Sequence, residues 1–197
     1  MRVLLGMPCM RSIPFKTVVS LLRTAKKGAV EPFMVEGSLV YDSRDAIAKF
    51  AIENDFDYVL YVDSDMVFDS EDLNRLLAHN ADICTGLYVT RNGENTNVAY
   101  SRVIKGRRFP ARESKLIVDT RSSGYDRVAA CGFGFCLIRT EVIKCMLKRY
   151  KSLFEPKWSV GEDIAFCLRA QECGYEVYID RDVKLGHIGD IVYGDRD

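Results

Sequence analysis

Two carboxylates stand two positions apart at the end of an apolar segment that reads YVLYV over residues 58–62. Side chains on extended backbone alternate, so Asp63 and Asp65 would point to the same side of a strand. Such concentrated negative charge is costly without a cation, and hard oxygen ligands suit Mg²⁺ or Mn²⁺ that also binds a substrate's phosphates. The alternative is that the acids merely start a turn, but Asp69 is already suited to cap the following helix.

Three further ionisable residues lie in sequence contexts that suit ligand binding or proton transfer. His187 lies between Gly186 and Gly189, in a loop that could bring backbone close to a ligand, although a lone histidine is often a surface or core residue. Glu162 and Asp163 fall in the first turn of a predicted helix, where the helix dipole alone favours carboxylates. The same dipole keeps a carboxylate ionised, which suits a general base.

A positive side chain stands near the start of another predicted helix. Ser43 could cap this helix, which would place Arg44 and Asp45 in its first turn. A cation is unfavourable there unless an anion shares the site, so Arg44 and the helix N-terminus could hold a phosphate together. The alternative is a simple ion pair between Arg44 and Asp45 on a solvated face.

Residues at the ends of the first two predicted strands complete a candidate nucleotide site. Arg11 directly follows Pro8 and Cys9 and is a second candidate for contact with a nucleotide. Glu36 ends the second predicted strand and could receive a base or a ribose. Ser64, between the two aspartates, belongs to the same candidate site.

Length and composition indicate one compact domain. The chain has 197 residues, 48% of them hydrophobic, which is ample for a core. Lys plus Arg and Asp plus Glu both number 28, so no net field would attract nucleic acid, and we expect no nucleic-acid partner. The seven cysteines contain no CxxC pair, which argues against a zinc cluster or a disulfide framework and indicates reduced, buried thiols.

Two observations argue against export and membrane insertion. The first apolar run is too short, and too quickly broken by Gly6 and Pro8, for a secretion signal. No segment approaches the roughly 20 apolar residues that cross a bilayer. We therefore expect a cytoplasmic protein without an integral membrane segment.

The hydrophobic pattern alternates between strand and helix in the first half and changes to a mixed pattern after residue 90. It predicts strands at 3–5, 32–37, 58–62, 81–89, 127–139 and 175–180, a hairpin region at 97–120, and helices that begin near Pro14, Ser43, Asp69, Thr140 and Glu162. The first helix has an apolar stripe of Val18, Val19, Leu22 and Ala25, and His187 lies in a terminal loop. All strands are expected on one sheet, whose ligands bind at strand carboxyl ends where the strand order switches.

Glycines and one tryptophan mark further positions of interest. Gly132 and Gly134 interrupt a predicted strand, either to let a substrate approach the backbone or as a bulge. Trp158 could stack on an acceptor sugar or simply pack. The basic run 105–112 reads as a solvated hairpin face, with contact to an anionic acceptor as the alternative.

Four features in this order resemble the glycosyltransferases of the GT-A fold, the nucleotide-sugar-dependent class, and in particular its inverting family 2 type. They are the strand that ends at Gly6-Met7-Pro8, the strand followed by Asp63-Ser64-Asp65, the segment Gly132-Phe133-Gly134, and Gly161-Glu162-Asp163 opening a helix, with His187 after the last strand. The resemblance covers nearly the whole chain. It implies a single α/β domain of GT-A (Rossmann-like) type, with a mixed, mostly parallel central sheet flanked by helices.

The resemblance also implies roles for these residues. Asp65 would bind Mn²⁺ or Mg²⁺, His187 would complete the metal site, and Asp63 would contact the ribose or reach the metal through water. Asp163 would be the base, and Glu162 an acceptor or structural contact. Similar sequences carry Asn after the arginine, whereas this chain has Asp45.

The implied reaction moves a sugar from a UDP- or GDP-sugar donor to a saccharide or other hydroxyl acceptor, with inversion. Residues 1–90 would form the nucleotide-binding half and residues 91–197 the acceptor side. One alternative is a nucleotidyltransferase that makes sugar nucleotides. That class shows a Gly-rich phosphate loop after the first strand, where this chain has only Gly6. The other alternative is a catalytically inactive module that binds nucleotide sugars.

Overall fold

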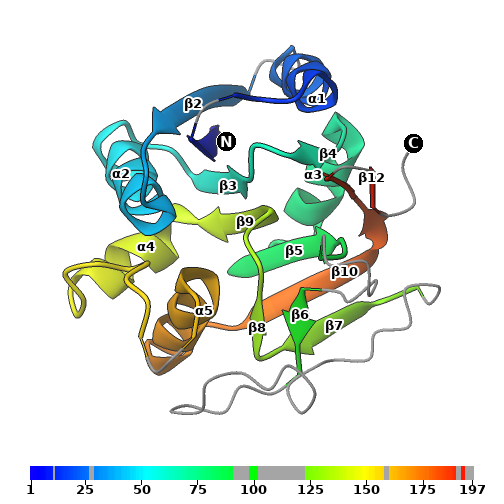
Figure 1. Ribbon diagram of the computed structural model, residues 1–197. Helices are drawn as coiled ribbons and strands as arrows, with labels where there is room; N and C mark the ends of the chain where they lie inside the picture. The colour runs from blue at the N-terminus through cyan, green and yellow to red at the C-terminus, as the bar shows by residue number, and fades with distance from the viewer. Residues whose placement is uncertain are drawn as a thin grey trace.

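A central sheet lies between two layers of helices in the computed structural model, which describes residues 1–10, 12–26, 29–90, 98–101, 123–157, 160–189 and 192–193 (Figure 1). The strands are β1 (Val3–Cys9), β2 (Val30–Glu36), β3 (Tyr58–Val62), β4 (Met66–Val67), β5 (Ile83–Leu87), β6 (Ala99–Tyr100), β7 (Tyr125–Val128), β8 (Ala130–Cys131), β9 (Phe135–Arg139), β10 (Val177–Lys184), β11 (Gly186–Ile188) and β12 (Val192–Tyr193). The helices are α1 (Phe15–Ala25), α2 (Val40–Glu53), α3 (Ser70–Ala78), α4 (Thr140–Leu147) and α5 (Glu162–Glu172).

The main sheet has the strand order β2-β1-β3-β9-β5-β10-β7. Five of these seven strands run in one direction, whereas β9 and β7 run antiparallel to their neighbours. The chain passes from β1 out to the edge strand β2 and then returns across β1 to β3. The strand order therefore switches between β1 and β3, the place where sheets of this kind bind ligands at their carboxyl ends. The mixed, mostly parallel sheet predicted from the sequence is confirmed.

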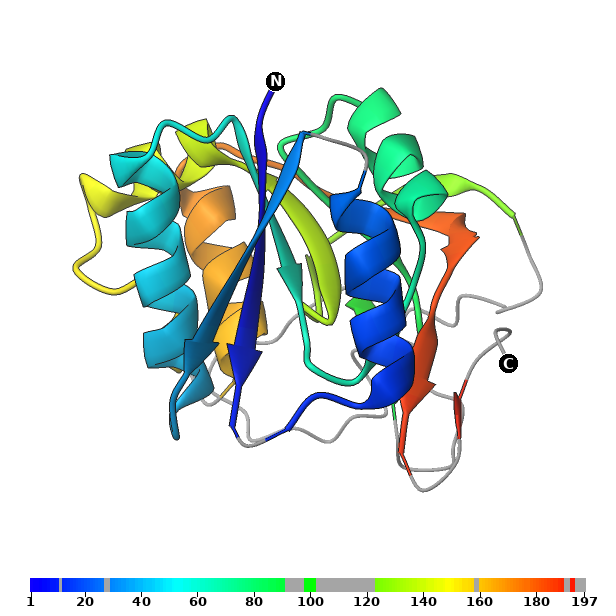
Figure 2. The same cartoon turned by 90° about the horizontal axis from the view of Figure 1, so that it is seen from above.

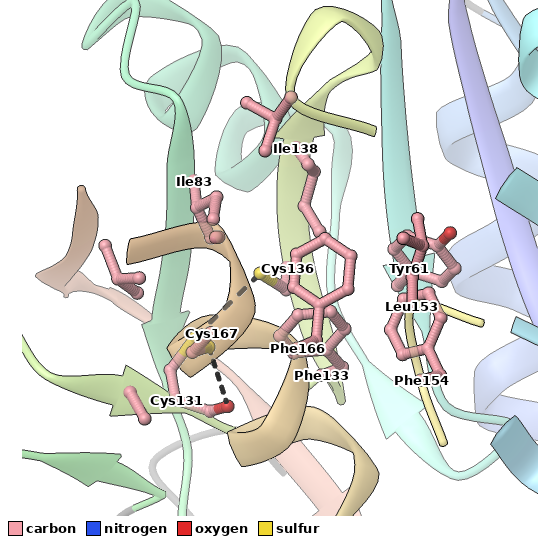
Figure 3. Close-up of a cluster of buried hydrophobic side chains, with 14 of the residues drawn as sticks. Tyr61, Ile83, Cys131, Phe133, Cys136, Ile138, Leu153, Phe154, Phe166 and Cys167 are labelled. Atoms are coloured by element: carbon pink, nitrogen blue, oxygen red, sulfur yellow. Dashed lines mark hydrogen bonds between the residues drawn. The ribbon is translucent and has the colours of Figure 1, made fainter. Parts of the chain in front are cut away.

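The two faces of the sheet carry separate cores. Side chains of α2, α4 and α5 pack on one face, and those of α1 and α3 pack on the other (Figure 2). Alternation along β3 sends Val59 and Tyr61 to the first core, and Leu60 and Val62 to the second. In the first core, Figure 3 shows a group of aromatic rings beside three thiols. The rings are those of Tyr61, Phe133, Phe154 and Phe166, and the thiols are those of Cys131, Cys136 and Cys167.

All seven cysteines are free, and four of them are buried, as the sequence indicated. The sulfur atoms of Cys131 and Cys136 lie 3.9 Å apart, and the Cys167 thiol donates to the carbonyl of Cys131 (Figure 3). Burial raises the pKa of Cys136, so this thiol stays protonated and contributes to core packing.

Within the described ranges, no helix is both long enough and apolar enough to cross a bilayer.

Local signals predicted some element boundaries correctly and others wrongly. Asp69 caps α3 as expected, in a capping box with Asp72. Helix α2 begins at Val40 rather than after Ser43, whose hydroxyl donates to the carbonyl of Leu39 instead. Pro32 lies inside β2, which tolerates a proline because β2 is an edge strand.

The expectation that all strands share one sheet is wrong. Strands β12, β11 and β4 form a separate three-stranded sheet, and β6 pairs with β8 in another. His187 accordingly lies in β11 rather than in a loop. The pairing of β11 with β4 joins residues that are distant in sequence, which local periodicity cannot predict.

The apolar stripe of α1 does not face the core. The buried residues of this helix are Thr17, Ser20, Leu21 and Thr24. Of the stripe predicted from the sequence, Leu22 is exposed, and Val18, Val19 and Ala25 are half-buried. Helix α1 therefore packs on the sheet mainly through small polar side chains.

Close packing of β1 against α2 yields a stability prediction. A Cβ atom on Gly6 would lie 2.3 Å from Cγ2 of Ile47. We expect Gly6→Ala to lower the free energy of unfolding by about 1–3 kcal/mol in urea denaturation, because both elements are fixed by the core. Combining it with Ile47→Ala removes the clashing atom, so the double variant should lose less than the sum of the single losses. Strict additivity would contradict the clash.

Candidate active site

The carboxylates predicted as a metal site lie in the turn between β3 and β4, at the carboxyl ends of the parallel strands. Met66 of β4 is paired with His187 of β11, and the Ile188 amide donates to the carbonyl of Asp65 at 2.7 Å. The short β4–β11 ladder thus brings the histidine to the aspartates from the far end of the chain. Nε2 of His187 lies 3.3 Å from Oδ1 of Asp65.

The contacts of His187 show how its ring is oriented. Nδ1 lies 2.8 Å from the carbonyl oxygen of Val89. A carbonyl only accepts, so Nδ1 must donate, and Nε2 is the nitrogen that faces the Asp65 carboxylate; on a neutral ring, the form that binds metals, Nε2 presents a lone pair there. Two electron-rich groups that face each other suit a cation between them, and a carboxylate with an imidazole suits Mn²⁺ or Mg²⁺. Asp65 and His187 therefore fit a divalent cation.

Asp63 points to a different partner. Its Oδ1 accepts a hydrogen bond from Nη2 of Arg44 at 2.8 Å, and its amide donates to the carbonyl of Gly134. Burial raises the pKa of Asp63, and Arg44 opposes this shift. Over the described positions, no group of three or more histidine, cysteine or acidic side chains forms a metal-binding cluster. The metal contact predicted for Asp63 stays a prediction.

Arg44 joins three parts of the site. Besides Asp63, its guanidinium donates through Nη1 to Oε1 of Glu162 at 2.9 Å, and it lies 5.5 Å from the ring centre of Phe133. The side chain is only 3% exposed. Burial alone would lower the pKa of Arg44, but Asp63, Asp163 and Glu162 outweigh burial and raise it. Because α2 starts at Val40, Arg44 lies in its second turn and not at the N-terminus predicted for phosphate binding.

Helix α5 brings the two predicted catalytic carboxylates into the same region. Glu162 and Asp163 occupy its first turn, directly after Gly161. Oδ1 of Asp163 accepts from the amide of Ile164 at 2.7 Å. Burial, with a contribution from Glu162 against the opposing effect of Arg44, raises the pKa of Asp163 to about 6. This carboxyl can therefore exchange a proton near neutral pH.

The glycine segment before β9 makes room for a tyrosine that the sequence analysis did not single out. The hydroxyl of Tyr88 accepts from the amide of Gly134 at 2.7 Å. A Cβ atom on Gly132 would lie 2.5 Å from this hydroxyl oxygen and 3.5 Å from Oδ2 of Asp163. The glycines thus let the backbone approach Tyr88 and Asp163 closely. Burial raises the pKa of Tyr88, so its phenol stays protonated.

The remaining predicted site residues divide into two groups. Pro8 and Cys9 end β1, Glu36 ends β2, and Cys9 and Glu36 are register partners, so these three lie together at one edge of the sheet. Ser64 lies in the turn between β3 and β4.

The second group lies apart from these strand ends or outside the described residues, and its first member is Asp45. Its carboxylate accepts from the Ser152 hydroxyl at 2.5 Å and from the Leu153 amide at 2.9 Å, so it holds the segment that follows α4. Arg11, Trp158 and the basic run 105–112 lie outside the described residues.

Comparisons with known proteins identify the fold. No family model and no curated protein matches the sequence. The crystal structure of A197 from STIV has a TM-score of 0.69 at 18% identity, with 100% of this chain and 95% of that chain covered. The crystal structure of GalNAc-T7 with UDP, GalNAc and Mn²⁺ has a TM-score of 0.62 at 15% identity, with 95% of this chain and 44% of that chain covered. The fold is of the GT-A type. At these identities the likeness establishes the fold alone.

The ion pairs of the buried Arg44 side chain yield a stability prediction. Arg44→Leu leaves Asp63 and Glu162 without their cation, so we expect a loss of about 3 kcal/mol in the free energy of unfolding at pH 7. The loss should shrink as the pH falls and Asp63, whose pKa is raised by burial, becomes protonated. Urea denaturation across pH measures both effects, and Arg127→Leu, which removes an exposed ion pair with Glu176, is the control. A loss that does not change with pH would contradict the electrostatic explanation.

Proposed function

We propose that the protein is a glycosyltransferase that moves a sugar from a nucleotide-diphosphate-sugar donor to a hydroxyl acceptor. The observation that carries this proposal is that Asp65 meets His187 in the turn after β3, beside the strand-order switch, while Arg44 links Asp63 of the same turn to the start of α5, which carries Asp163. The GT-A fold supports it, because GalNAc-T7 has this fold and was crystallised with UDP, GalNAc and Mn²⁺. We place the donor on residues 1–90 and the acceptor on residues 91–197.

We propose Mn²⁺ or Mg²⁺ as the cofactor, with Asp65 and His187 as the residues that would hold it. Asp63 would assist through water or contact the ribose of the donor. A bound divalent cation supplies Lewis-acid neutralisation of the diphosphate leaving group. The chain's own contribution is orientation, because the Val89 carbonyl fixes the His187 ring so that Nε2 faces Asp65.

Asp163 is our proposed general base. Its raised pKa, about 6, lets it remain ionised near neutral pH and still accept a proton from an incoming hydroxyl group. Removal of that proton as the hydroxyl oxygen attacks the sugar from the side opposite the diphosphate would give inversion. Glu162 is held by Arg44 and is better suited to a structural contact than to proton transfer.

We propose the residues that bind the nucleotide from their positions at the ends of the strands. Pro8, Cys9 and Glu36 lie at the carboxyl ends of β1 and β2, beside the switch point, where a base and ribose would bind. Ser64 lies in the turn after β3, the strand that pairs with β1. The phosphate contact predicted for Arg44 stays a prediction, because two of its nitrogens already bind carboxylates.

Two substitutions separate donor binding from transfer. Asp65→Ala should abolish metal-dependent binding of UDP- and GDP-sugars, because Asp65 would hold the metal. Asp163→Asn should leave binding intact and stop transfer, because Asp163 would accept the proton of the incoming hydroxyl group. Isothermal titration with Mn²⁺ measures binding, and hydrolysis or transfer of a labelled donor measures turnover. Glu53→Ala, which removes an exposed carboxylate at the end of α2, is the control.

The same experiment decides between the alternatives. Equal loss of binding and transfer in both variants would contradict the assigned roles. Donor binding without turnover toward any acceptor would favour an inactive binding module. If the wild-type protein neither binds nor hydrolyses any UDP- or GDP-sugar in the presence of manganese, the proposal is contradicted. Synthesis of a sugar nucleotide from nucleoside triphosphate would favour a nucleotidyltransferase.

The pKa of Asp163 predicts a pH dependence. A carboxyl with a raised pKa takes up its proton at a higher pH than usual, so the base is lost as the pH falls through about 6. We expect kcat/KM to fall about tenfold per pH unit below this point, as one protonation requires. Initial rates under saturating metal measure it, and the circular dichroism spectrum checks that the fold persists. A flat profile across this range would exclude Asp163 as the base.

A further inference from the structure

Helix α1 has its larger apolar side chains on the outside. Phe15 is 81% exposed and Leu22 is 60% exposed, and they lie seven positions apart on the same side of the helix. Val18 and Val19 lie between them and are half-buried. A helix on the surface of a globular protein normally has the opposite arrangement, with its large apolar residues against the core.

The inner side of α1 consists mostly of hydroxyl-bearing residues. Thr17, Ser20 and Thr24 are buried against the sheet with Leu21. Ser20 accepts from the amide of Phe68, but the hydroxyls of Thr17 and Thr24 have no hydrogen-bond partner among the residues that the structure describes. Burying unpartnered hydroxyls costs free energy, and so does leaving Phe15 in water. The outer side of α1 therefore has the composition of a surface that makes a further contact.

The neighbouring edge strand exposes one more large apolar side chain on the same side of the sheet. Val30 of β2 packs in the same core as Leu21 of α1, so alternation along the strand places Met34 on the α1 side of the sheet. Met34 is 48% exposed. Figure 1 shows α1 beside β2 along the top edge of the molecule. A groove of about 470 Å³, lined in part by Phe15, Val19 and Phe68, lies on the other side of the helix.

The charges on this helix have one sign. Lys16, Arg23 and Lys26 are exposed, and the segment from Phe15 to Lys26 contains no acidic residue. In helical projection the cations lie within and beside the row formed by Phe15 and Leu22. The whole protein has a formal net charge of zero, so this concentration of cations is local. Asp69 lines the adjacent groove, but its carboxylate accepts from the Glu71 amide to cap α3.

We propose that the outer face of α1, formed by Phe15, Lys16, Leu22, Arg23 and Lys26 with Met34 of β2, binds the surface of a membrane that contains anionic lipids. The cations pair with lipid phosphates, and the apolar side chains enter the boundary between headgroups and acyl chains. The absence of carboxylates on α1 favours a uniformly anionic surface over a protein partner, whose surface would carry both signs. This is lateral binding of a surface helix and not membrane insertion.

The position of this face sets the orientation of the bound protein. Helix α1 follows β1 closely, and it begins at the end of the sheet where β1 and β3 terminate (Figure 2). Phe15 is the first residue of α1, and Asp63 and Asp65 directly follow β3. Membrane binding through α1 would hold the candidate active site beside the lipid surface. This orientation bears on the proposed function by favouring an acceptor hydroxyl carried on a lipid. Binding itself is measured without donor or metal, so its failure is distinguishable from failure of the proposed transfer.

Vesicle flotation tests the proposal on the full chain. Wild type should float with phosphatidylcholine vesicles that contain phosphatidylglycerol, and binding should weaken as salt is added. Lys16→Gln, Arg23→Gln and Lys26→Gln together should weaken binding roughly 100-fold, at about fivefold per charge. The matched control, Lys144→Gln, Lys148→Gln and Lys151→Gln, removes three exposed cations from the α4 region and should retain binding. Phe15→Ser with Leu22→Ser should also abolish flotation.

Three outcomes would overturn the proposal. The first is absence of wild-type binding to anionic vesicles. The second is equal weakening by the α1 and α4 substitutions, which would indicate non-specific charge attraction. The third is a wild-type dimer that Phe15→Ser with Leu22→Ser converts to a monomer without any lipid binding, which would make this face a contact between two copies of the chain. The substituted side chains are exposed, so each variant should remain folded. A cooperative unfolding transition in urea checks this.

Discussion

A single buried cation holds the candidate site together. The Arg44 guanidinium donates to Asp63 at the end of β3 and to Glu162 at the start of α5, and its electrostatic field also reaches Asp163. Without a positive charge at this point, three carboxylates from two distant segments would repel one another in a poorly hydrated place. The site therefore depends on α2, a helix that supplies no proposed catalytic group. Asp45, the next residue of α2, ties the same helix to Ser152 and Leu153.

Strand periodicity and helix start signals correctly located several elements that form the site. The apolar run 58–62 followed by two acids located β3 and its carboxyl end, and Gly161 with two acids located the start of α5. These predictions succeed because they depend on alternation and capping, which are local properties. The general α/β architecture followed from the alternation of strands and helices in the first half of the chain.

Other parts of the site depend on contacts that no local pattern encodes. His187 reaches Asp65 through the β4–β11 ladder, although only its setting between glycines and its place after the last predicted strand marked it in the sequence. Tyr88 sits in an apolar run that looks like any core strand, and its role as a partner of Gly134 becomes visible only when β5 and β9 are neighbours. The orientation of α1 was also hidden, because periodicity identifies an apolar stripe but not what the stripe contacts.

The reversed strand β9 has a consequence for how the chain reaches its native state. It lies between β3 and β5 and is the last of the three to be synthesised. Until it arrives, β3 is the open edge of a partial sheet formed by β1, β2 and β3, and the apolar run Tyr58–Val62 has no partner on that side. Pairings between segments so far apart in sequence form slowly, and unpaired apolar edges invite association with other chains. A nascent or truncated chain that stops before residue 135 would therefore be prone to aggregate, and the site would form late in folding.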